Sequence, residues 1–140
     1  MGEHWNKGID DLIFDAAIPI IDKYREEIDA IYIGHVLSQY FGLQGNLGAF
    51  ATDILGLNHL PAFWINNAEA SGLSALYTAM HAILSGEFDT VLVGGVEKLT
   101  DVIGRKVIEG VTLTIHNAIL NRTGATLAGI AELMAKEYMK

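Results

Sequence analysis

The sequence predicts an α/β fold with a mainly parallel sheet and helices on both faces. Two observations predict it. Short apolar runs recur along the chain, and longer stretches with apolar side chains at spacings of three and four residues separate them. Strands that alternate with helices in this way are joined by right-handed crossovers, so they build a parallel sheet covered on both sides.

The first part of the chain supplies a helix, a strand and a second helix. Residues 9–28 place their apolar side chains on one helical face, and Pro19 is expected to kink or shorten that helix. Residues 28–34 form an apolar run that is typical of a buried strand. Residues 44–55 are again helical, and Gly56 is a plausible C-terminal stop.

The middle of the chain repeats the alternation. Residues 62–65, which follow Pro61, are predicted to form the second strand, and residues 90–95 the third. Between them, residues 71–84 have the clearest helical pattern in the chain, and Gly86 ends it. The apolar stripe of this helix consists of Leu73, Leu76, Tyr77, Met80, Ile83 and Leu84.

The last third is less regular. Residues 111–115 alternate apolar and β-branched polar side chains, which favours a half-exposed strand. Residues 125–139 are predicted to be helical. No internal repeat, low-complexity segment or linker interrupts the sequence, so a single domain over residues 1–140 is the simplest interpretation.

Composition excludes several classes of function. The hydrophobic fraction of 51% supports a real core, but no apolar run reaches the roughly 18 residues that span a bilayer. The N-terminus lacks the layout of a signal peptide, so a soluble cytoplasmic protein is expected. A net charge of −8 argues against nucleic acid and anionic membranes as partners. The chain has no cysteine, and its five histidines lack metal-ligand spacing, so no metal site is predicted.

Several motifs occur in the order and spacing of a known family, and they lie at residues 28–34, 44–48, 68–76, 85–89 and 91–101. The chain resembles the N-terminal half of thiolases, most closely the archaeal and sterol-carrier-type acetyl-CoA acetyltransferases. The strongest match covers residues 29–101, and residues 102–140 match only weakly.

The resemblance implies a sharp turn between a strand and a helix. In thiolases this elbow places a cysteine thiolate at the N-terminus of the helix, where it accepts the acyl group. In this sequence the matched position is Glu69. Ser71 and Gly72 are expected to permit the tight turn and the close packing of helix on sheet. The elbow and a possible ligand pocket comprise Asn66, Asn67, Ala70, Ser71 and Gly72.

Three departures from the family bear on activity. A carboxylate at position 69 cannot form the thioester that thiolase chemistry needs. The histidine base, the acid–base cysteine and the asparagine-linked water site of the family's second half have no counterpart here. The family's first, central strand also has no counterpart, and either residues 111–115 or a strand from another copy is expected to replace it.

These departures favour a non-enzymatic function. We expect a binding or assembly subunit that is inactive as a thiolase, or the remnant of a split gene. Thiolases of this lineage can sit in complexes with HMG-CoA synthase and a small OB-fold protein. The alternative is an acyl-CoA-directed hydrolase or decarboxylase that uses Glu69. No cofactor is required, although coenzyme A is a possible ligand. A homodimer through residues 62–66 is expected, because Phe63 and Trp64 suit an interface.

Each candidate residue also has a structural interpretation. Glu69 can stabilise a helix N-terminus by about 0.3–1 kcal/mol instead of acting as a base. Asn66 and Asn67 can satisfy backbone groups in a turn rather than orient a ligand. His35 and His81 are expected to be core or surface side chains. An intact pocket with a coenzyme A channel would favour the enzymatic function. A pocket that is blocked or open to solvent would favour the binding or assembly subunit.

Overall fold

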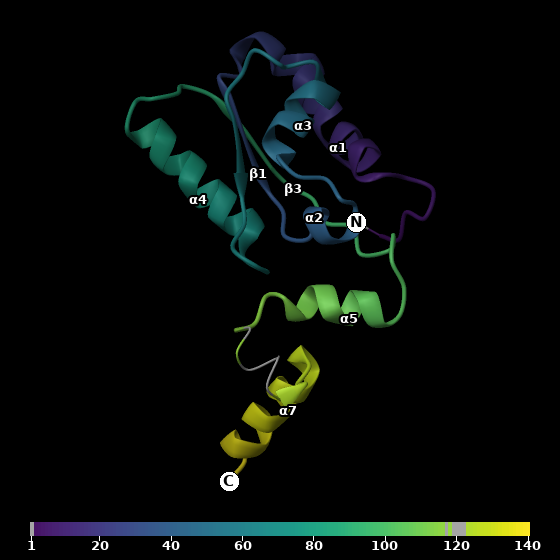
Figure 1. Cartoon of the computed structure of the whole chain (residues 1–140). Helices are drawn as coiled ribbons and strands as arrows, with labels where there is room; N and C mark the ends of the chain where they lie inside the picture. Colours follow the sequence, from purple (N-terminus) through teal and green to yellow (C-terminus); the bar gives the residue numbers. More distant parts are fainter. Residues whose placement is uncertain (1, 117, 119–122) are drawn as a thin grey trace. The chain divides into compact units, whose positions relative to one another are not determined.

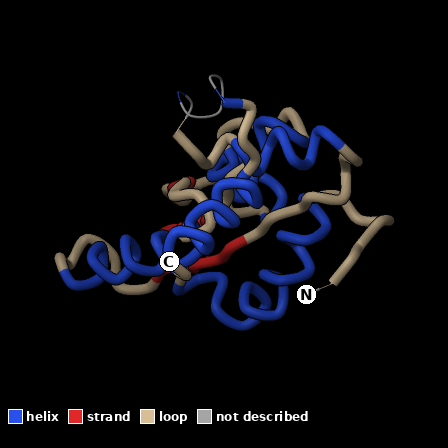
Figure 2. Tube along the Cα trace, turned by 90° about the horizontal axis from the view of Figure 1, so that it is seen from below, coloured by secondary structure: helices blue, strands red, loops and turns tan. Residues whose placement is uncertain are grey.

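A computed structural model describes residues 2–116, 118 and 123–140. The chain divides into two compact units, Met1–Asp101 and Val102–Lys140. Figure 1 traces both, and each is considered by itself below. Most of the described chain is helix or loop, and the strands are short (Figure 2).

The first unit is built on a parallel sheet. The described strands are β1 (Ala30–Gly34), β2 (Ala62–Ile65) and β3 (Val91–Gly95), in the order β2-β1-β3. Both pairings are parallel, and Tyr32 in the central strand lies between Phe63 and Val93. All five residues of β1 are buried, as expected of a strand covered on both faces. The predicted α/β class and the three predicted strands are confirmed.

Helices cover both faces of this sheet. α1 (Ile9–Tyr24) and α3 (Leu47–Leu55) lie on one side of the strands, and α4 (Ser71–Leu84) lies on the other (Figure 1). The side chains of β1 alternate between two cores. Ile31 and Ile33 pack toward α1 and α3, whereas Ala30 and Tyr32 pack toward α4.

The first helix does not end at Pro19, as the sequence had suggested. α1 continues past Pro19 to Tyr24 and is followed by the 3₁₀ turn η1 (Arg25–Glu27). Ile21, just beyond the proline, is fully buried. The guanidinium of Arg25 donates to the carbonyl oxygen of Gly56, 3.1 Å away, and so ties the end of α1 to the end of α3. Burial beyond Pro19 and this tether hold the helix in place, so Pro19 does not end it, and the alternative expectation of a kink stays a prediction.

α4 packs on the sheet with its small residues. Its buried positions are Ser71, Ala75, Ala79 and Ala82. The alanines let the helix approach the bulky strand residues closely. The large apolar side chains lie on the opposite side of the helix and point away from the sheet. The predicted stripe is therefore exposed in this unit, and its members are Leu73, Leu76, Tyr77, Met80, Ile83 and Leu84.

A short helix, α2 (Ser38–Phe41), follows β1, and the second unit contains α5 (Arg105–Thr112) and α7 (Leu127–Tyr138). The helix predicted for residues 125–139 is confirmed, and Thr126 caps it by accepting a hydrogen bond from the Gly129 amide at 3.1 Å. Among the described residues, no helix is long and apolar enough to cross a membrane.

The strand predicted for residues 111–115 is wrong. Val111 and Thr112 belong to the end of α5, and the next three residues form turns. The hydroxyls of Thr112 and Thr114 donate to the backbone carbonyls of Ile108 and Val111, so both bond locally within their own turn. The alternation therefore reflects a helix terminus, and this segment does not join the described sheet.

Candidate functional site

The carboxyl ends of the three parallel strands bring three loops together. Ligands of open parallel sheets commonly bind at this edge. The amide nitrogen of Val36, after β1, donates to the carboxylate of Glu97, after β3, at 3.0 Å. The side-chain amide of Asn66, after β2, donates to the carbonyl oxygen of Val36 at 3.2 Å. The loop after β1 is thus bonded to both of its neighbours.

The loop after β2 forms the predicted sharp turn into α4. Ala68 has a φ of +49°, in the left-handed region that non-glycine residues rarely adopt. The Asn66 side-chain oxygen accepts a hydrogen bond from the Ala68 amide at 3.3 Å. The amides of Ala70 and Ser71 bond to the carbonyls of Asn67 and Ala68, both at 3.0 Å. These bonds redirect the chain within three peptide units and allow the left-handed residue.

The polar side chains of this turn bond within it. The Ser71 hydroxyl donates to the carbonyl oxygen of Ala68 at 2.6 Å and accepts from the Asn67 amide at 2.8 Å. The Asn67 side-chain amide donates to the hydroxyl of Ser74 at 2.8 Å. Both asparagines and Ser71 therefore have roles in shaping the elbow, of the kind expected for backbone-satisfying turn residues.

Glu69 lies on the surface just before the helix. Ala70 is the N-cap residue of α4 and Ser71 its first helical residue, so Glu69 precedes the cap. Its side chain is exposed, and its backbone forms an isolated parallel bridge with Asn67. At this position a carboxylate lies near the positive end of the helix dipole.

The close contact between helix and sheet involves a different glycine from the predicted one. A Cβ built on Gly34 would lie 2.6 Å from the carbonyl carbon of Ser71 and 2.7 Å from the Cα of Gly72. A Cβ on Gly72 itself would meet nothing within 4 Å. Because Gly34 has no side chain, α4 can approach the sheet at this point. The backbone of Gly72 is part of the helix surface that lies against Gly34.

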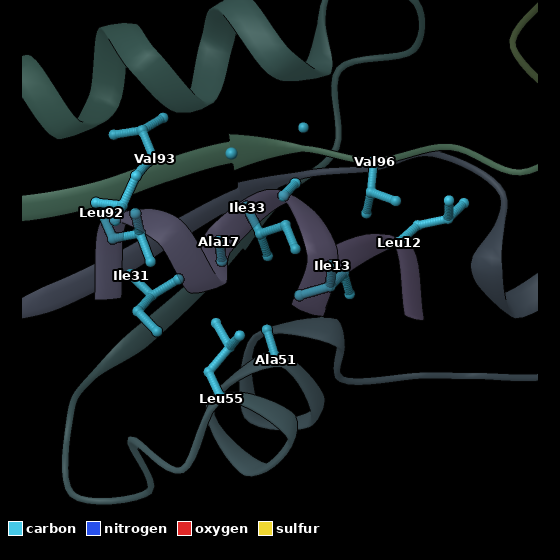
Figure 3. Close-up of a pocket in the computed structure, with 14 residues that line it drawn as sticks. Leu12, Ile13, Ala17, Ile31, Ile33, Ala51, Leu55, Leu92, Val93 and Val96 are labelled. Atoms are coloured by element: carbon cyan, nitrogen blue, oxygen red, sulfur yellow. The ribbon is translucent and has the colours of Figure 1, made fainter. Parts of the chain in front are cut away.

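Three described cavities lie in the first unit, and none is lined by residues 66–72. The apolar one in Figure 3, of about 150 Å³, lies among α1, α3, β1 and β3, on the opposite face of the sheet from α4. Two others, of about 20 and 210 Å³, share Lys98 in the loop after β3. In the described part of the chain, no group of three or more His, Asp or Glu residues could hold a metal ion.

Sequence reasoning assigned no role to a second group of polar residues at the same edge. His35, Ser38 and Lys98 are all buried, although serine and lysine are mostly exposed in proteins. In the sequence, this group is indicated by the position of His35, which directly follows a predicted parallel strand. His81, by contrast, is exposed on α4, where it contacts Tyr77 edge-on at 4.4 Å.

Comparison with known proteins bears on the whole chain. A family model described as the N-terminal domain of thiolase matches residues 5–139. An acetyl-CoA acetyltransferase of Methanocaldococcus jannaschii is 32% identical over 142 residues, which cover 99% of this chain and 36% of that protein. One from Methanothermobacter thermautotrophicus is 29% identical, with the same coverage of 99% and 36%. One from Allochromatium vinosum is 40% identical over 76 residues. The chain spans about a third of the length of its two full-coverage relatives, at 36%.

Proposed function

The chain belongs to the thiolase family, of which it carries the N-terminal domain, and on this basis we propose that it acts as a binding and assembly subunit rather than as a thiolase. The relatives are acetyl-CoA acetyltransferases, and this chain spans 36% of their length. Their activity therefore does not transfer to it directly.

The chemistry of the elbow supports an inactive subunit. Covalent acyl transfer of the thiolase type uses a thiolate nucleophile, and the chain contains no cysteine. The position that resembles the nucleophile holds Glu69, which is exposed at the surface before α4. A carboxylate cannot replace a thiol in forming a thioester.

The outward side of α4 is the observation that carries the proposal. We call the set Leu73, Leu76, Tyr77, Met80 and Leu84 the α4 outer face. Three of these side chains are more than 60% exposed, namely Leu73 at 70%, Tyr77 at 62% and Leu84 at 75%. Soluble monomers rarely expose contiguous apolar patches of more than a few hundred Å². An apolar face on a helix that begins beside the elbow is suited to docking against another protein.

The partner we propose for the α4 outer face is a further thiolase-type half domain. The relatives extend well beyond the matched segment, so the family fold contains material that this chain does not. A second copy is proposed to pair through residues 62–66, where β2 is an edge strand and Phe63 is 37% exposed. From the resemblance, we also propose that such an assembly joins an HMG-CoA synthase-type complex.

Site-specific photo-crosslinking in the native host tests the docking face. A benzophenone amino acid at position 76 is expected to crosslink to a thiolase-family polypeptide that mass spectrometry identifies. The matched control places the same group at Asp22, which is exposed on α1. Equal crosslinking from both positions, or crosslinks from position 76 to chaperones alone, would contradict the proposal.

The alternative is an acyl-CoA hydrolase or decarboxylase that uses Glu69. It would need a chamber for the acyl group beside this carboxylate, and none of the three described cavities is lined by Glu69. Coenzyme A as a ligand is a separate proposal. Calorimetric titration of the intact chain with coenzyme A, compared with its Glu69→Ala variant, tests whether this site binds it.

A further inference from the structure

A small cavity lies between the ends of β1 and β3. Its volume is about 20 Å³, and His35, Ser38, Lys98 and Asp101 contribute to its lining. His35 is 2% exposed, Ser38 3% and Lys98 8%, so three polar side chains are withdrawn from solvent around one small space. Burial of this kind is costly unless each polar atom has a partner.

The contacts of His35 determine which ring nitrogen carries the proton. Its Nδ1 contacts the carbonyl oxygen of Val96, and the carboxylate of Glu97 lies 3.5 Å from the same nitrogen. Both are acceptors, so Nδ1 must be the N–H donor. In the neutral imidazole, Nε2 is then an acceptor with a lone pair.

Two buried atoms of the cavity lining need a partner. Nε2 of His35 and Oγ of Ser38 are buried and have no hydrogen-bond partner within the part of the chain that the structure describes. An acceptor nitrogen needs a donor, whereas a serine hydroxyl can both donate and accept. A single molecule that donates and accepts can satisfy both atoms.

Charge and volume determine what that molecule is. Lys98 and Asp101, the charged residues of the lining, are paired with each other, so they require no further ion. A cavity needs about 10–15 Å³ to admit one water, and 20 Å³ leaves no room for anything larger. A neutral molecule of one heavy atom is the species that fits.

We propose that one water molecule is bound in this cavity as a permanent part of the fold. It donates to Nε2 of His35 and accepts from the hydroxyl of Ser38. The site positions the loop after β1, since the carbonyl oxygen of His35 accepts a hydrogen bond from the Trp64 indole at 2.9 Å. The water thereby supports the connection between the β3 loop and the strand that leads into the elbow.

Nuclear magnetic resonance on the ¹⁵N-labelled full chain tests the proposal. We expect the imidazole of His35 to be the Nδ1–H tautomer, and its carbon-bound ring protons to show a nuclear Overhauser cross peak with long-lived water. The Ser38→Thr variant puts a methyl group into the cavity, so this cross peak should disappear. Ser85→Thr is the control, because Ser85 is exposed and its hydroxyl donates to the Ala82 carbonyl at 2.9 Å.

Several results would overturn the site. One is that His35 is the Nε2–H tautomer. Another is that the folded wild-type chain shows no water cross peak. A third is that the cross peak survives in the folded Ser38→Thr variant. If that variant does not fold, a high-resolution crystal structure of the wild-type chain decides instead. Solvent density within hydrogen-bond distance of both Nε2 and Ser38 Oγ supports the proposal, and a direct bond between these two atoms contradicts it.

Discussion

Gly34, the last residue of β1, lies directly against the backbone of Ser71, the first residue of α4. A Cβ on Gly34 would come within 2.6 Å of both the carbonyl carbon and the carbonyl oxygen of Ser71. No side chain can be accommodated there unless the helix moves. This contact sets the distance of the elbow from the sheet, and the position of Glu69 depends on it.

Replacing Gly34 should therefore destabilise the protein. Gly34→Ala is expected to lower the free energy of unfolding by about 1–3 kcal/mol, the usual cost of overpacking. Urea unfolding followed by circular dichroism measures it. Gly72→Ala is the control, because a Cβ there meets nothing and alanine favours a helix by up to about 1 kcal/mol. Equal midpoints for the two variants would show that the contact is not rigid.

Thiolysis of acetoacetyl-CoA should not be detectable with the purified protein. The physical reason is the absence of any thiol in the chain, together with an exposed carboxylate at the elbow. Release of acetyl-CoA, followed by absorbance or chromatography, measures it. Turnover that persists through purification and is lost in Glu69→Ala would contradict this prediction.

Restoring a thiol at the elbow should not restore thiolysis. Glu69→Cys supplies a nucleophile, but nucleophile and base act as a unit, and no residue here has been identified as that base. The new thiol should nevertheless alkylate readily, because the N-terminus of α4 favours a thiolate. Iodoacetamide kinetics and the thiolysis assay measure the two properties separately. Measurable thiolysis by this variant would mean that a basic group acts at the elbow after all.

The protein should be an oligomer, most simply a homodimer through residues 62–66. Analytical ultracentrifugation over a dilution series measures the mass. Phe63→Lys is expected to shift the mass toward the monomer, because the edge strand β2 carries this side chain, which is 37% exposed. Phe14→Lys on α1 changes a side chain of similar exposure, 41%, and should leave the mass unchanged. A stable wild-type monomer at micromolar concentration would exclude the dimer.

Alkaline pH should destabilise the first unit through Tyr32. Burial, with a smaller contribution from Glu87, raises the pKa of this phenol above its ordinary value of 10.0. A raised folded-state pKa means that its contribution to stability is complete below about pH 10 and is lost as pH rises further. As the pH rises above about 10, the urea midpoint of unfolding should therefore fall less for the Tyr32→Phe variant than for the wild type. Tyr138→Phe, which changes an exposed side chain, should behave like the wild type.

Local patterns predicted most of the elements in the first unit. The strand at residues 62–65 and the helix at 71–84 agree with the structure residue for residue, because periodicity and the glycine and proline at their ends are properties of adjacent residues. The same reasoning failed at residues 111–115. There, alternation fitted a strand equally well, but the segment is a helix end in which two threonine hydroxyls bond to carbonyls of their own turn.

By itself, the sequence determined the α/β class, the thiolase resemblance and the absence of a thiol nucleophile, because each depends only on residue types and their order. The tertiary structure alone decided that the apolar stripe of α4 faces outward, that Gly34 rather than Gly72 admits the helix, and that His35 is buried beside Ser38. Each of these depends on contacts between segments far apart in the chain. Spacing along a helix defines a stripe but does not say whether the sheet meets that stripe or the alanines on the other side.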